Sequence, residues 1–461
     1  MKIRNRKPIS SAQVVTWRGR KLLDRLLWRK PQAALLLSLV MASSVWFYVQ
    51  RILIPYQIAD AAAHGRPRGV LSDLYPRWLG TRELLLHHRD PYSPEVTHDI
   101  QIGYYGRALD PNRSDDPKDE QRFAYPVYVA FFLAPTANLK FEDVRIAVAC
   151  TLGILTALSV LCWVHFLRWP LSRTMLTVII VLTISSFAVV QGIKLQQLSL
   201  LVAGIIAAAA ALLATGQLFA AGFLLAVATI KPQLVLLLVT WLLLWSVSRC
   251  HERRTLFWGF ALGMLLLVGA GEYVLPGWIG RFVNAVAAYR RYTENRSPLE
   301  VMTTPRVATL LTIMVLAATI AVGWRCRHSA VHSFPFQLVT AFTLTLTLLI
   351  APTNAPYNQI LLLPGVFLIC SAWNQLWKKS IWSRAFCILM VVLVSWPWLS
   401  SFFLMLASIF LPPSTVQKAW AVPLWTSIAV PLVVLGLLAP LASEAWRRGM
   451  RQEAEPPSAL A

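Results

Sequence analysis

The chain has 461 residues, of which 57% are hydrophobic and only 14% are charged, against about 25% charged in an ordinary soluble protein. One soluble core does not hide that much apolar surface, so the composition excludes a soluble globular protein and indicates many membrane-spanning helices. The formal net charge is +22, and residues 1–30 carry ten Lys or Arg residues against one acid, Asp24. Because an apolar run follows this arm at once, we interpret it as a cytoplasmic segment on anionic lipid rather than a nucleic-acid-binding arm.

The first apolar run, at about 33–54, is too long for a cleaved secretory signal and predicts a retained first span. The stretch 55–122 that follows carries 11 of the 21 acidic residues of the chain. A plain connector between two helices needs only a few residues. We therefore predict that this loop performs chemistry at the membrane surface.

The remaining apolar runs predict eleven further spans. They cover about 123–137, 146–167, 174–190, 196–214, 217–248, 255–275, 303–323, 334–352, 357–374, 386–410 and 419–442. The run 217–248 is counted as one crossing although Lys231-Pro232 interrupts it, because two crossings would invert everything after it. The expected fold is therefore an all-α membrane protein with about 12 transmembrane helices and interfacial helices in the first loop.

Basic clusters set the expected orientation. With 12 spans, Arg249, Arg253 and Arg254 are cytoplasmic together with both termini, and the two long loops are extracytoplasmic in the plasma or inner membrane. The expected organisation is a basic segment 1–30, a catalytic transmembrane module 31–275 that contains the loop 55–122, a second loop 276–302, C-terminal helices 303–443 and a cytoplasmic tail 444–461.

The first long loop offers two candidate acids. The stretch 72–86 predicts an interfacial helix that Ser72 or Asp73 is suited to cap, with Pro76 tolerated in its first turn. For Asp73, a plain N-cap and a catalytic carboxylate are equally consistent with the pattern. Asp90 is the second candidate acid, although its Asp-Pro-Tyr context also predicts an ordinary turn.

The sequence gives little support to a metal or disulfide site. The adjacent His87 and His88 point about 100° apart on a helix and do not chelate one ion together. The six cysteines form no CxxC pair and none lies in the long loop, which argues against disulfides and structural zinc. We expect no metal ligand and no cofactor, and the sequence leaves a divalent-metal requirement open.

Four basic residues are candidates for binding a lipid-linked phosphate. A lysine in apolar sequence costs roughly 2.5–3.5 kcal/mol to insert and is a functional candidate by default, so Lys231 ranks first, although it also suits the end of a half-span. Arg122 lies at the expected headgroup level, where a snorkelling anchor is the alternative. Arg290 and Arg291 lie in the second loop, on a helix expected near 278–285, where a solvated or lipid-facing surface is the alternative.

Amide and tyrosine side chains are candidates for binding the sugar or the acceptor. Asn354, Asn358 and Gln359 occupy a short polar link that is expected on the same side as both loops. We group them with Tyr75 and Tyr125. The polar cluster at 191–197 falls between two expected spans and is interpreted as a cytoplasmic turn.

Taken in order, these motifs resemble a known family. An acid opens a helix in the first loop and Asp90-Pro91-Tyr92 follows it. Phe123-Ala124-Tyr125-Pro126 begins the second apolar run, Ile230-Lys231-Pro232 lies mid-chain, and Tyr357-Asn358-Gln359 precedes Leu361-Leu362-Leu363-Pro364. Over about residues 33–375 the chain resembles the GT-C glycosyltransferases of family 87, the polyprenol-phosphate-mannose-dependent mannosyltransferase group.

The resemblance implies a GT-C fold, a sugar donor linked to polyprenyl phosphate, and inversion at the anomeric carbon. Asp73 matches the position of the family's proposed catalytic acid residue. We expect Asp73 to act as a base on a hydroxyl of a lipid, glycan or protein, while Lys231 with Arg122 or Arg290 stabilises the leaving phosphate. The absence of a Gly-rich phosphate loop fits a donor that is not a nucleotide sugar.

Two other functions are consistent with the sequence. A transporter or flippase for a lipid-linked saccharide predicts several charges along a translocation pathway. A non-catalytic membrane scaffold predicts that Asp73→Asn is silent. The sequence names neither the sugar, which is mannose or another hexose or pentose, nor the acceptor.

Overall fold

The structure is a computed structural model, and it describes residues 31–65, 72–110, 112–293, 296–351 and 355–454. The basic arm 1–30 and Asn354, both named above, lie outside the described residues. Within the described residues the fold contains helices and no strand, so the predicted all-α class is confirmed.

The helices follow one another with short connections. They are α2 (Pro31–Tyr48), η1 (Val49–Leu53), α3 (Ile54–Ala63), α4 (Tyr75–His87), α5 (Pro94–Tyr105), α6 (Val129–Leu133), η2 (Ala134–Thr136), α7 (Phe141–Phe166), α8 (Arg173–Ile184), α9 (Phe187–Lys194), α10 (Leu198–Ala214), α11 (Leu218–Val227), η3 (Ala228–Ile230), α12 (Pro232–Val247), α13 (Cys250–Val274), α14 (Trp278–Thr293), α15 (Pro298–Met302), α16 (Pro305–Cys326), α17 (Phe334–Ile350), η4 (Pro356–Leu362), α18 (Leu363–Ser371), α19 (Trp373–Lys379), α20 (Ile381–Phe410), α21 (Pro413–Gln417), η5 (Val422–Leu424) and α22 (Ala429–Ala454). The helix α14 confirms the one expected in the second loop.

Helix length and composition indicate a membrane protein. Among the described residues, six stretches are long and apolar enough to cross a bilayer. They are Pro31–Ala63, Phe141–Phe166, Cys250–Val274, Pro305–Cys326, Ile381–Phe410 and Pro413–Ser443. Two bent pairs, α8 with α9 and η4–α18 with α19, raise the number to eight if each pair is one span. Shorter apolar helices fill the rest of the bundle.

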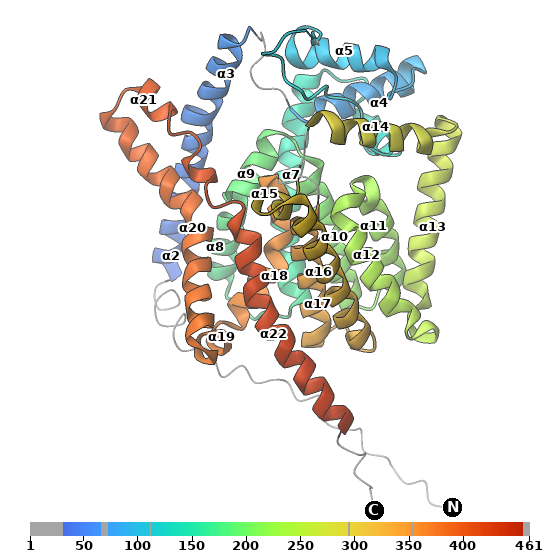
Figure 1. The fold of residues 1–461 in the computed structure, drawn as a ribbon, viewed down its shortest axis with the longest axis vertical. Helices are drawn as coiled ribbons and strands as arrows, with labels where there is room; N and C mark the ends of the chain where they lie inside the picture. Colours follow the sequence, from blue (N-terminus) through green and yellow to red (C-terminus); the bar gives the residue numbers. More distant parts are fainter. Residues whose placement is uncertain (1–30, 66–71, 111, 294–295, 352–354, 455–461) are drawn as a thin grey trace, which may run out of the picture.

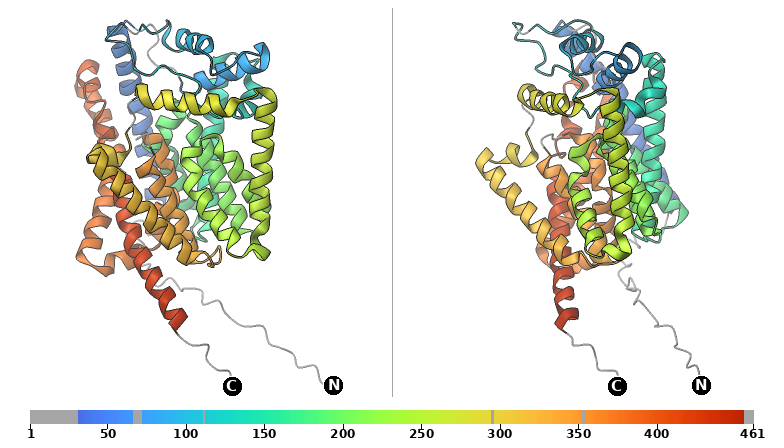
Figure 2. Two further views of the ribbon diagram at one scale, coloured as in Figure 1. Left: turned by 45° about the vertical axis from the view of Figure 1, so that its right-hand side comes forward. Right: turned by 90° about the vertical axis from the view of Figure 1, so that its right-hand side faces the viewer.

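The bundle has two distinct ends. The helices α4, α5 and α14 lie across one end, which we call the loop end (Figure 1). At the opposite end, α12 passes into α13 and α16 turns into α17 (Figures 1 and 2). We call this the basic end because Arg249, Arg253 and Arg327 gather there.

The apolar run at 123–137 does not form the expected second span. It folds as α6, which has five residues, and η2, which has three. At 1.5 Å per residue, five residues rise only about 7.5 Å, whereas the hydrocarbon core is about 30 Å thick. The indole nitrogen of Trp78 on α4 donates to the Thr136 carbonyl over 3.1 Å, so the run stays at the loop end. Pro126 and Pro135 prevent a longer helix.

The run at 217–248 does not make the single crossing we expected. It breaks at Lys231, and the helix restarts at Pro232, which has no N–H to continue the preceding ladder. Residues 222 and 226 of α11 contact residues 256 and 263 of α13 in ascending order, so α11 and α13 run in the same direction. Because α12 joins α13 through a tight turn, α12 runs the opposite way to α11.

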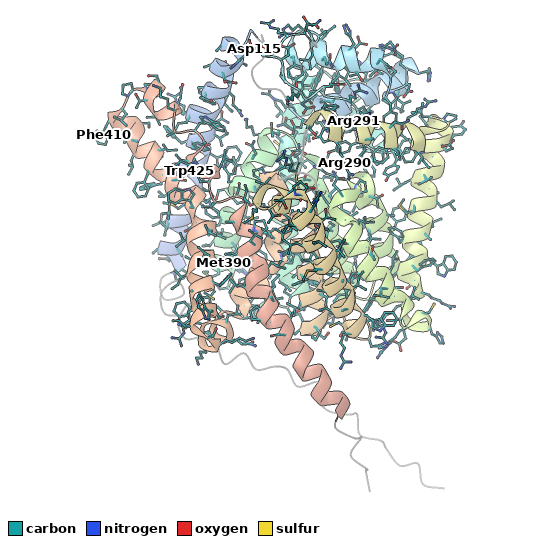
Figure 3. The ribbon with its side chains drawn as sticks, viewed as in Figure 1. Asp115, Arg290, Arg291, Met390, Phe410 and Trp425 are labelled. Carbon is teal, nitrogen blue, oxygen red and sulfur yellow. The ribbon has the colours of Figure 1, made fainter. Side chains whose placement is uncertain are left out.

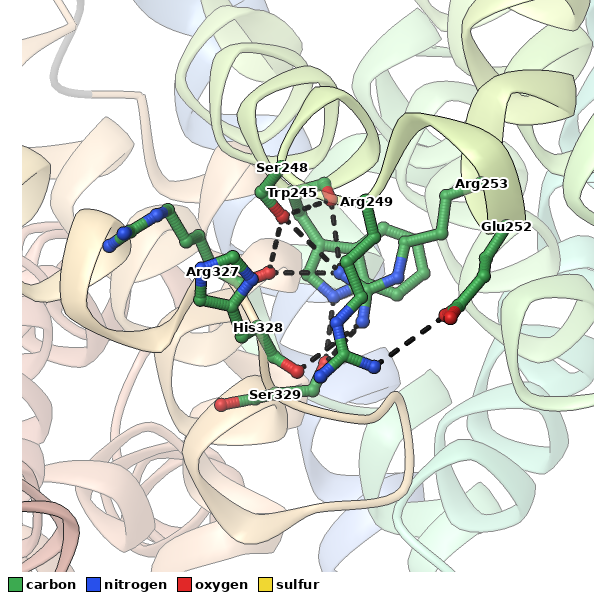
Figure 4. Close-up of polar contacts among 8 residues, drawn as sticks. All are labelled: Trp245, Ser248, Arg249, Glu252, Arg253, Arg327, His328 and Ser329. Atoms are coloured by element: carbon green, nitrogen blue, oxygen red, sulfur yellow. Dashed lines mark hydrogen bonds and ion pairs between the residues drawn. The ribbon is translucent and has the colours of Figure 1, made fainter. Parts of the chain in front are cut away.

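The run 123–137 makes one crossing fewer than predicted, and the run 217–248 makes one more. The side on which the following segments lie is therefore unchanged. The basic residues Arg249 and Arg253 therefore remain at the end opposite the acidic loop. There the Arg253 guanidinium stacks on the Trp245 ring at 3.9 Å and donates to the Arg327 carbonyl over 2.9 Å (Figure 4). This contact ties the α12–α13 hairpin to the turn after α16.

Close packing of α11 against α13 depends on glycine. A Cβ on Gly259 would lie 2.0 Å from the Phe219 carbonyl oxygen, which is backbone and does not move aside. Gly259→Ala is expected to lower the free energy of unfolding by about 1–3 kcal/mol through overpacking, despite the roughly 1 kcal/mol gain in helix propensity. Thermal unfolding of detergent-solubilised protein, followed by tryptophan fluorescence, measures the change.

The matched control is Gly269→Ala on the same helix, where no atom apart from the local helix backbone lies within 4 Å of the added Cβ. This variant is expected to be as stable as the wild type or slightly more stable. Equal melting temperatures for the two variants would contradict the packing argument.

Candidate active site

Asp73 is not the N-cap of α4. The helix begins at Tyr75 with Leu74 in the cap position, and no side chain caps it. The Ser72 hydroxyl accepts from the Leu74 N–H over 3.1 Å and donates to the Leu195 carbonyl over 3.0 Å. Pro76 lies in the first turn, as predicted. The Asp73 carboxylate is therefore free for a contact outside its own helix.

A hydrogen-bonded chain joins Asp73 to Lys231. The Gln197 side-chain N–H donates to Asp73 Oδ2, and Lys231 Nζ donates to the Gln197 carbonyl oxygen over 3.3 Å. Lys231 Nζ also donates to Ser199 Oγ over 2.6 Å, and Ser199 in turn donates to Asn358 Oδ1 over 2.7 Å. The first loop, the start of α10, the break before α12 and η4 thus meet at one cluster. We call Asp73, Gln197, Lys231, Ser199 and Asn358 the polar chain.

Four side chains of the polar chain are buried, so their hydrogen bonds matter for stability. Lys231 is 6% exposed, Gln197 4%, Asn358 1% and Ser199 0%. A buried polar group costs free energy unless it has a hydrogen-bond partner, and a buried charge costs more. Each of these four side chains meets that requirement at least in part through another member of the polar chain. The Asn358 Nδ2 donor is the exception, because it is buried and has no partner in the structure.

Two further cations lie near Asp73. The Arg77 guanidinium donates to the Asp73 main-chain carbonyl over 2.8 Å and stacks over the Tyr125 ring at 4.6 Å. Its Nε atom is buried without a partner. Lys194 Nζ donates to the side-chain carbonyl of Gln57 on α3 and interacts electrostatically with Asp73.

Asp73 is a half-buried carboxylate with a perturbed pKa. Burial raises its pKa above the usual value, because the charged form loses hydration. Arg77, the hydrogen bond from Gln197, and Lys231 oppose this rise without cancelling it. A carboxylate with a raised pKa and a cation nearby is the arrangement expected of a general base.

A second acid, Asp119, lies near the same cluster. Burial raises its pKa as well, and its electrostatic partners include Arg77 and Asp73. Its carboxylate accepts from the Gln121 main-chain N–H over 3.0 Å and from the Gln121 side chain over 2.9 Å. No motif in the sequence distinguishes Asp119 from the other acids of the first loop.

Asp90 takes the turn role that its sequence context predicts. Its Oδ1 accepts from the Tyr92 N–H over 2.9 Å, and its Oδ2 pairs with Arg281 on α14 over 2.8 Å. The pair is partly exposed and ties the first loop to α14. The structure thus gives Asp90 a fixed structural partner and gives Asp73 the buried cations.

The other predicted phosphate-binding arginines lie outside the polar chain. Arg122 pairs with Glu120 over 2.6 Å. Arg290 and Arg291 are exposed on α14 (Figure 3). The roles proposed for these three residues remain predictions.

The predicted sugar-binding residues are spread more widely. Tyr125 lies beneath the Arg77 guanidinium, and Asn358 belongs to the polar chain. Its neighbour Tyr357, which is not among the predicted sugar-binding residues, lies beside Lys231, with its ring centroid 5.1 Å from Nζ. Tyr75 packs edge-on against Phe141 at 4.9 Å. Gln359 donates to the Ser427 carbonyl and so anchors η4 to the segment before α22.

The cluster at 191–197 lies at the loop end and not, as the span count predicts, at the basic end. The hydrogen bond between Gln197 and Asp73 places it at the loop end. The predicted end is wrong because the run 123–137 counts as a span in the prediction. Without that crossing, the connection at 191–197 moves to the end where the first loop lies. The signal was present in the sequence: Lys194, Gln196 and Gln197 interrupt apolar sequence as Lys231 does.

Over the ranges that the structure describes, no three His, Cys, Asp or Glu side chains gather to form a metal site.

Comparison with known proteins adds one finding. Residues 123–352 match the model of glycosyltransferase family 87. The matched region contains Gln197, Ser199 and Lys231 and leaves Asp73 and Asn358 outside its limits. Neither the search of curated proteins nor that of solved structures found a match.

Ser199 offers a test of the polar chain that does not depend on activity. Ser199→Ala removes an acceptor from Lys231 and a donor from Asn358, so it leaves buried polar groups underpaired. The expected loss of unfolding free energy is about 1–3 kcal/mol. Chemical or thermal unfolding in detergent measures it.

Ser44→Ala is the control, because Ser44 is equally buried and bonds only to its own helix carbonyl at Val40. This variant is expected to change stability by much less. A Ser199→Ala protein as stable as the Ser44→Ala protein would show that the polar chain does not hold the cluster together.

Proposed function

The chain belongs to glycosyltransferase family 87 through residues 123–352, and from that premise we propose which sugar transfer it performs. We propose that the donor is a hexose or pentose, such as mannose, on a polyprenyl phosphate. The acceptor is a hydroxyl of a lipid, glycan or protein. The reaction inverts the anomeric centre and takes place at the extracytoplasmic face of the cell membrane.

One observation carries the proposal. The Asp73 carboxylate and the Lys231 ammonium, 158 residues apart in sequence, are linked through a single side chain, Gln197. A base for the acceptor and a cation for the leaving phosphate are the two groups that this transfer requires. Because the base and the cation lie together at the loop end, we place the binding site for the lipid-linked donor there.

The proposed step is a displacement at the anomeric carbon of the donor sugar. The acceptor hydroxyl oxygen attacks the anomeric carbon and forms a new glycosidic bond. The bond between that carbon and the phosphate oxygen breaks, and its electron pair leaves on the polyprenyl phosphate. Asp73 takes the hydroxyl proton, while Lys231 compensates the charge that develops on the phosphate. Attack from the face opposite the leaving group gives inversion.

The charge of the site fits a monophosphate donor. Arg77, Lys194 and Lys231 contribute three positive charges, and ionised Asp73 and Asp119 contribute two negative charges. One positive charge is left over. A polyprenyl phosphate sugar is a phosphodiester that carries one negative charge, so its binding would neutralise the cluster.

The proposed orientation rests on the basic end. Arg249, Arg253 and Arg327 lie together at the end opposite α4, α5 and α14. Loops rich in Lys and Arg stay in the cytoplasm. The loop end and the proposed site would then face the extracytoplasmic side, with both termini cytoplasmic.

The decisive variant is Asp73→Asn. Removing a general base is expected to lower label transfer from radiolabelled polyprenyl phosphate sugars by about 10²–10⁴-fold, because the amide of Asn does not accept the hydroxyl proton as a carboxylate does. Purified protein in proteoliposomes, given a panel of hydroxyl acceptors, provides the assay. Asp90→Asn is the matched control and is expected to retain most of the activity.

Wild-type activity in Asp73→Asn would exclude Asp73 as the base. Movement of unmodified lipid across the bilayer by the wild type, without label transfer, would favour a flippase instead.

The pH dependence follows from the raised pKa of Asp73. The base works when ionised, so the rate is expected to rise with pH through a pKa above the usual value of an aspartate carboxyl. The folded state also binds this proton more tightly than the unfolded state, so stability falls as pH rises from the unfolded to the folded pKa.

Asp73→Asn removes that loss of stability. Its melting temperature at neutral pH is therefore expected to equal or exceed that of the wild type. Melting curves from pH 4 to 8 check the sign, and a variant less stable than the wild type at neutral pH would contradict it.

A further inference from the structure

The side chain of Gln197 contacts both charged groups of the proposed reaction. Its N–H₂ group donates to Asp73 Oδ2, and its carbonyl oxygen accepts from Lys231 Nζ over 3.3 Å. Gln197 lies at the start of α10, where the chain leaves α9, and is 4% exposed. It is too buried to serve as a surface residue.

The charges on either side fix the orientation of this amide. An ionised carboxylate only accepts hydrogen bonds, and an ammonium group only donates them. The reversed amide would place its oxygen against Asp73 and its N–H₂ group against Lys231. Because hydrogen bonds in a chain polarise one another, the Lys231 contact strengthens the bond that Gln197 donates to Asp73.

A bound phosphate changes this arrangement. Lys231 has three N–H donors, and Gln197 and Ser199 take two of them. A lipid phosphate that draws the ammonium toward itself weakens the contact with Gln197. The Gln197 amide then stabilises the Asp73 anion less, and Asp73 becomes a stronger base.

We propose that Gln197 is a positioning residue that couples donor binding at Lys231 to the basicity of Asp73. The inference rests on the proposed function, because it assigns Lys231 to the phosphate and Asp73 to the acceptor proton. Coupling of this kind is reciprocal: ionisation of Asp73 and binding of the donor affect each other by the same free energy. It makes the base strongest when the sugar donor is in place.

Other charged and titratable groups also surround Asp73, and a test must leave them unchanged. They are Arg77 on α4, Tyr104 on α5, Asp119 in the first loop, Lys194 on α9, Lys231 before α12 and Tyr357 on η4. Substitution at Gln197 removes one hydrogen bond and leaves these groups in the chain. A change in the pH profile of such a variant therefore reports on Gln197.

The experiment compares Gln197→Met with Gln197→Glu in the full-length protein. Both keep the length of the side chain. Label transfer from a polyprenyl phosphate sugar that the wild type uses is measured from pH 4 to 9, together with donor KM and melting temperature. Gln197→Met is expected to move the acidic limb of the pH profile of kcat/KM, which reports the enzyme before the donor binds, upward by about one pH unit or more. That is the shift expected when a charged group loses one hydrogen bond.

Gln197→Glu is expected to move the acidic limb further. Two adjacent carboxylates do not both ionise readily, so the proton on Asp73 is held to higher pH. In both variants kcat at pH 6 falls about 10–100-fold, as with other residues that orient a reacting group, and the donor KM changes less than kcat. Gln197→Glu also serves if Gln197→Met does not fold.

The control is Gln196→Met. Gln196 is equally buried, but it donates only to the carbonyls of Ile193 and Lys194. This variant is expected to keep the wild-type acidic limb, whatever its stability.

A wild-type acidic limb in both Gln197 variants, with only a lower melting temperature, would overturn the coupling and leave Gln197 a structural residue. That result is distinct from failure of the proposed function, in which the wild type itself transfers no label. It is equally distinct from the case in which Asp73→Asn remains active.

Discussion

A carboxylate withdrawn from water must find compensation within the protein, and much of this site follows from that requirement at Asp73. Asp73 precedes α4 without capping it, so its carboxylate makes no hydrogen bond to the N–H groups of that helix. Compensation comes from far away in sequence. Gln197 donates a hydrogen bond to the carboxylate, and Lys231 donates one to the side-chain oxygen of Gln197. Arg77 donates to the main-chain carbonyl of Asp73. Three segments that are far apart in the sequence are thereby held at one point.

Interrupted helices make this meeting possible. The polar chain draws its members from places where a helical ladder stops: the connection between α9 and α10, the break between η3 and α12, and η4. A continuous helix satisfies its own backbone groups and presents apolar side chains to lipid. A broken one turns polar side chains toward the protein, at the level where the loop helices lie. The helix breaks at Lys231-Pro232 and between α9 and α10 thus coincide with the proposed chemistry.

Buried aromatic side chains pack the loop helix α4 against the segment that follows the first loop. Trp78 of α4 and Phe123 are both buried, and Gly80 of α4 leaves room for the Phe123 ring, which lies 2.4 Å from where a Cβ would be. At the far end, the guanidinium of Arg253 ties the α12–α13 hairpin to the α16–α17 turn. The packing of Phe123 against α4 holds the helix that follows Asp73. The hydrogen bond from Arg253 holds the hairpin that follows Lys231.

The sequence by itself determined the all-α membrane class, the acidic loop and its helix, the interest of Asp73 and Lys231, and the resemblance to family 87. These follow from composition, hydrophobic run length and the cost of polar groups in apolar sequence, all of which are local properties. Only the tertiary structure decided that 123–137 is too short to cross, that 217–248 turns back at Lys231, and that Gln197 joins Asp73 to Lys231. The side of the bilayer on which a connection lies depends on every crossing before it, and hydrogen bonds between segments more than a hundred residues apart leave no periodic signal in the chain.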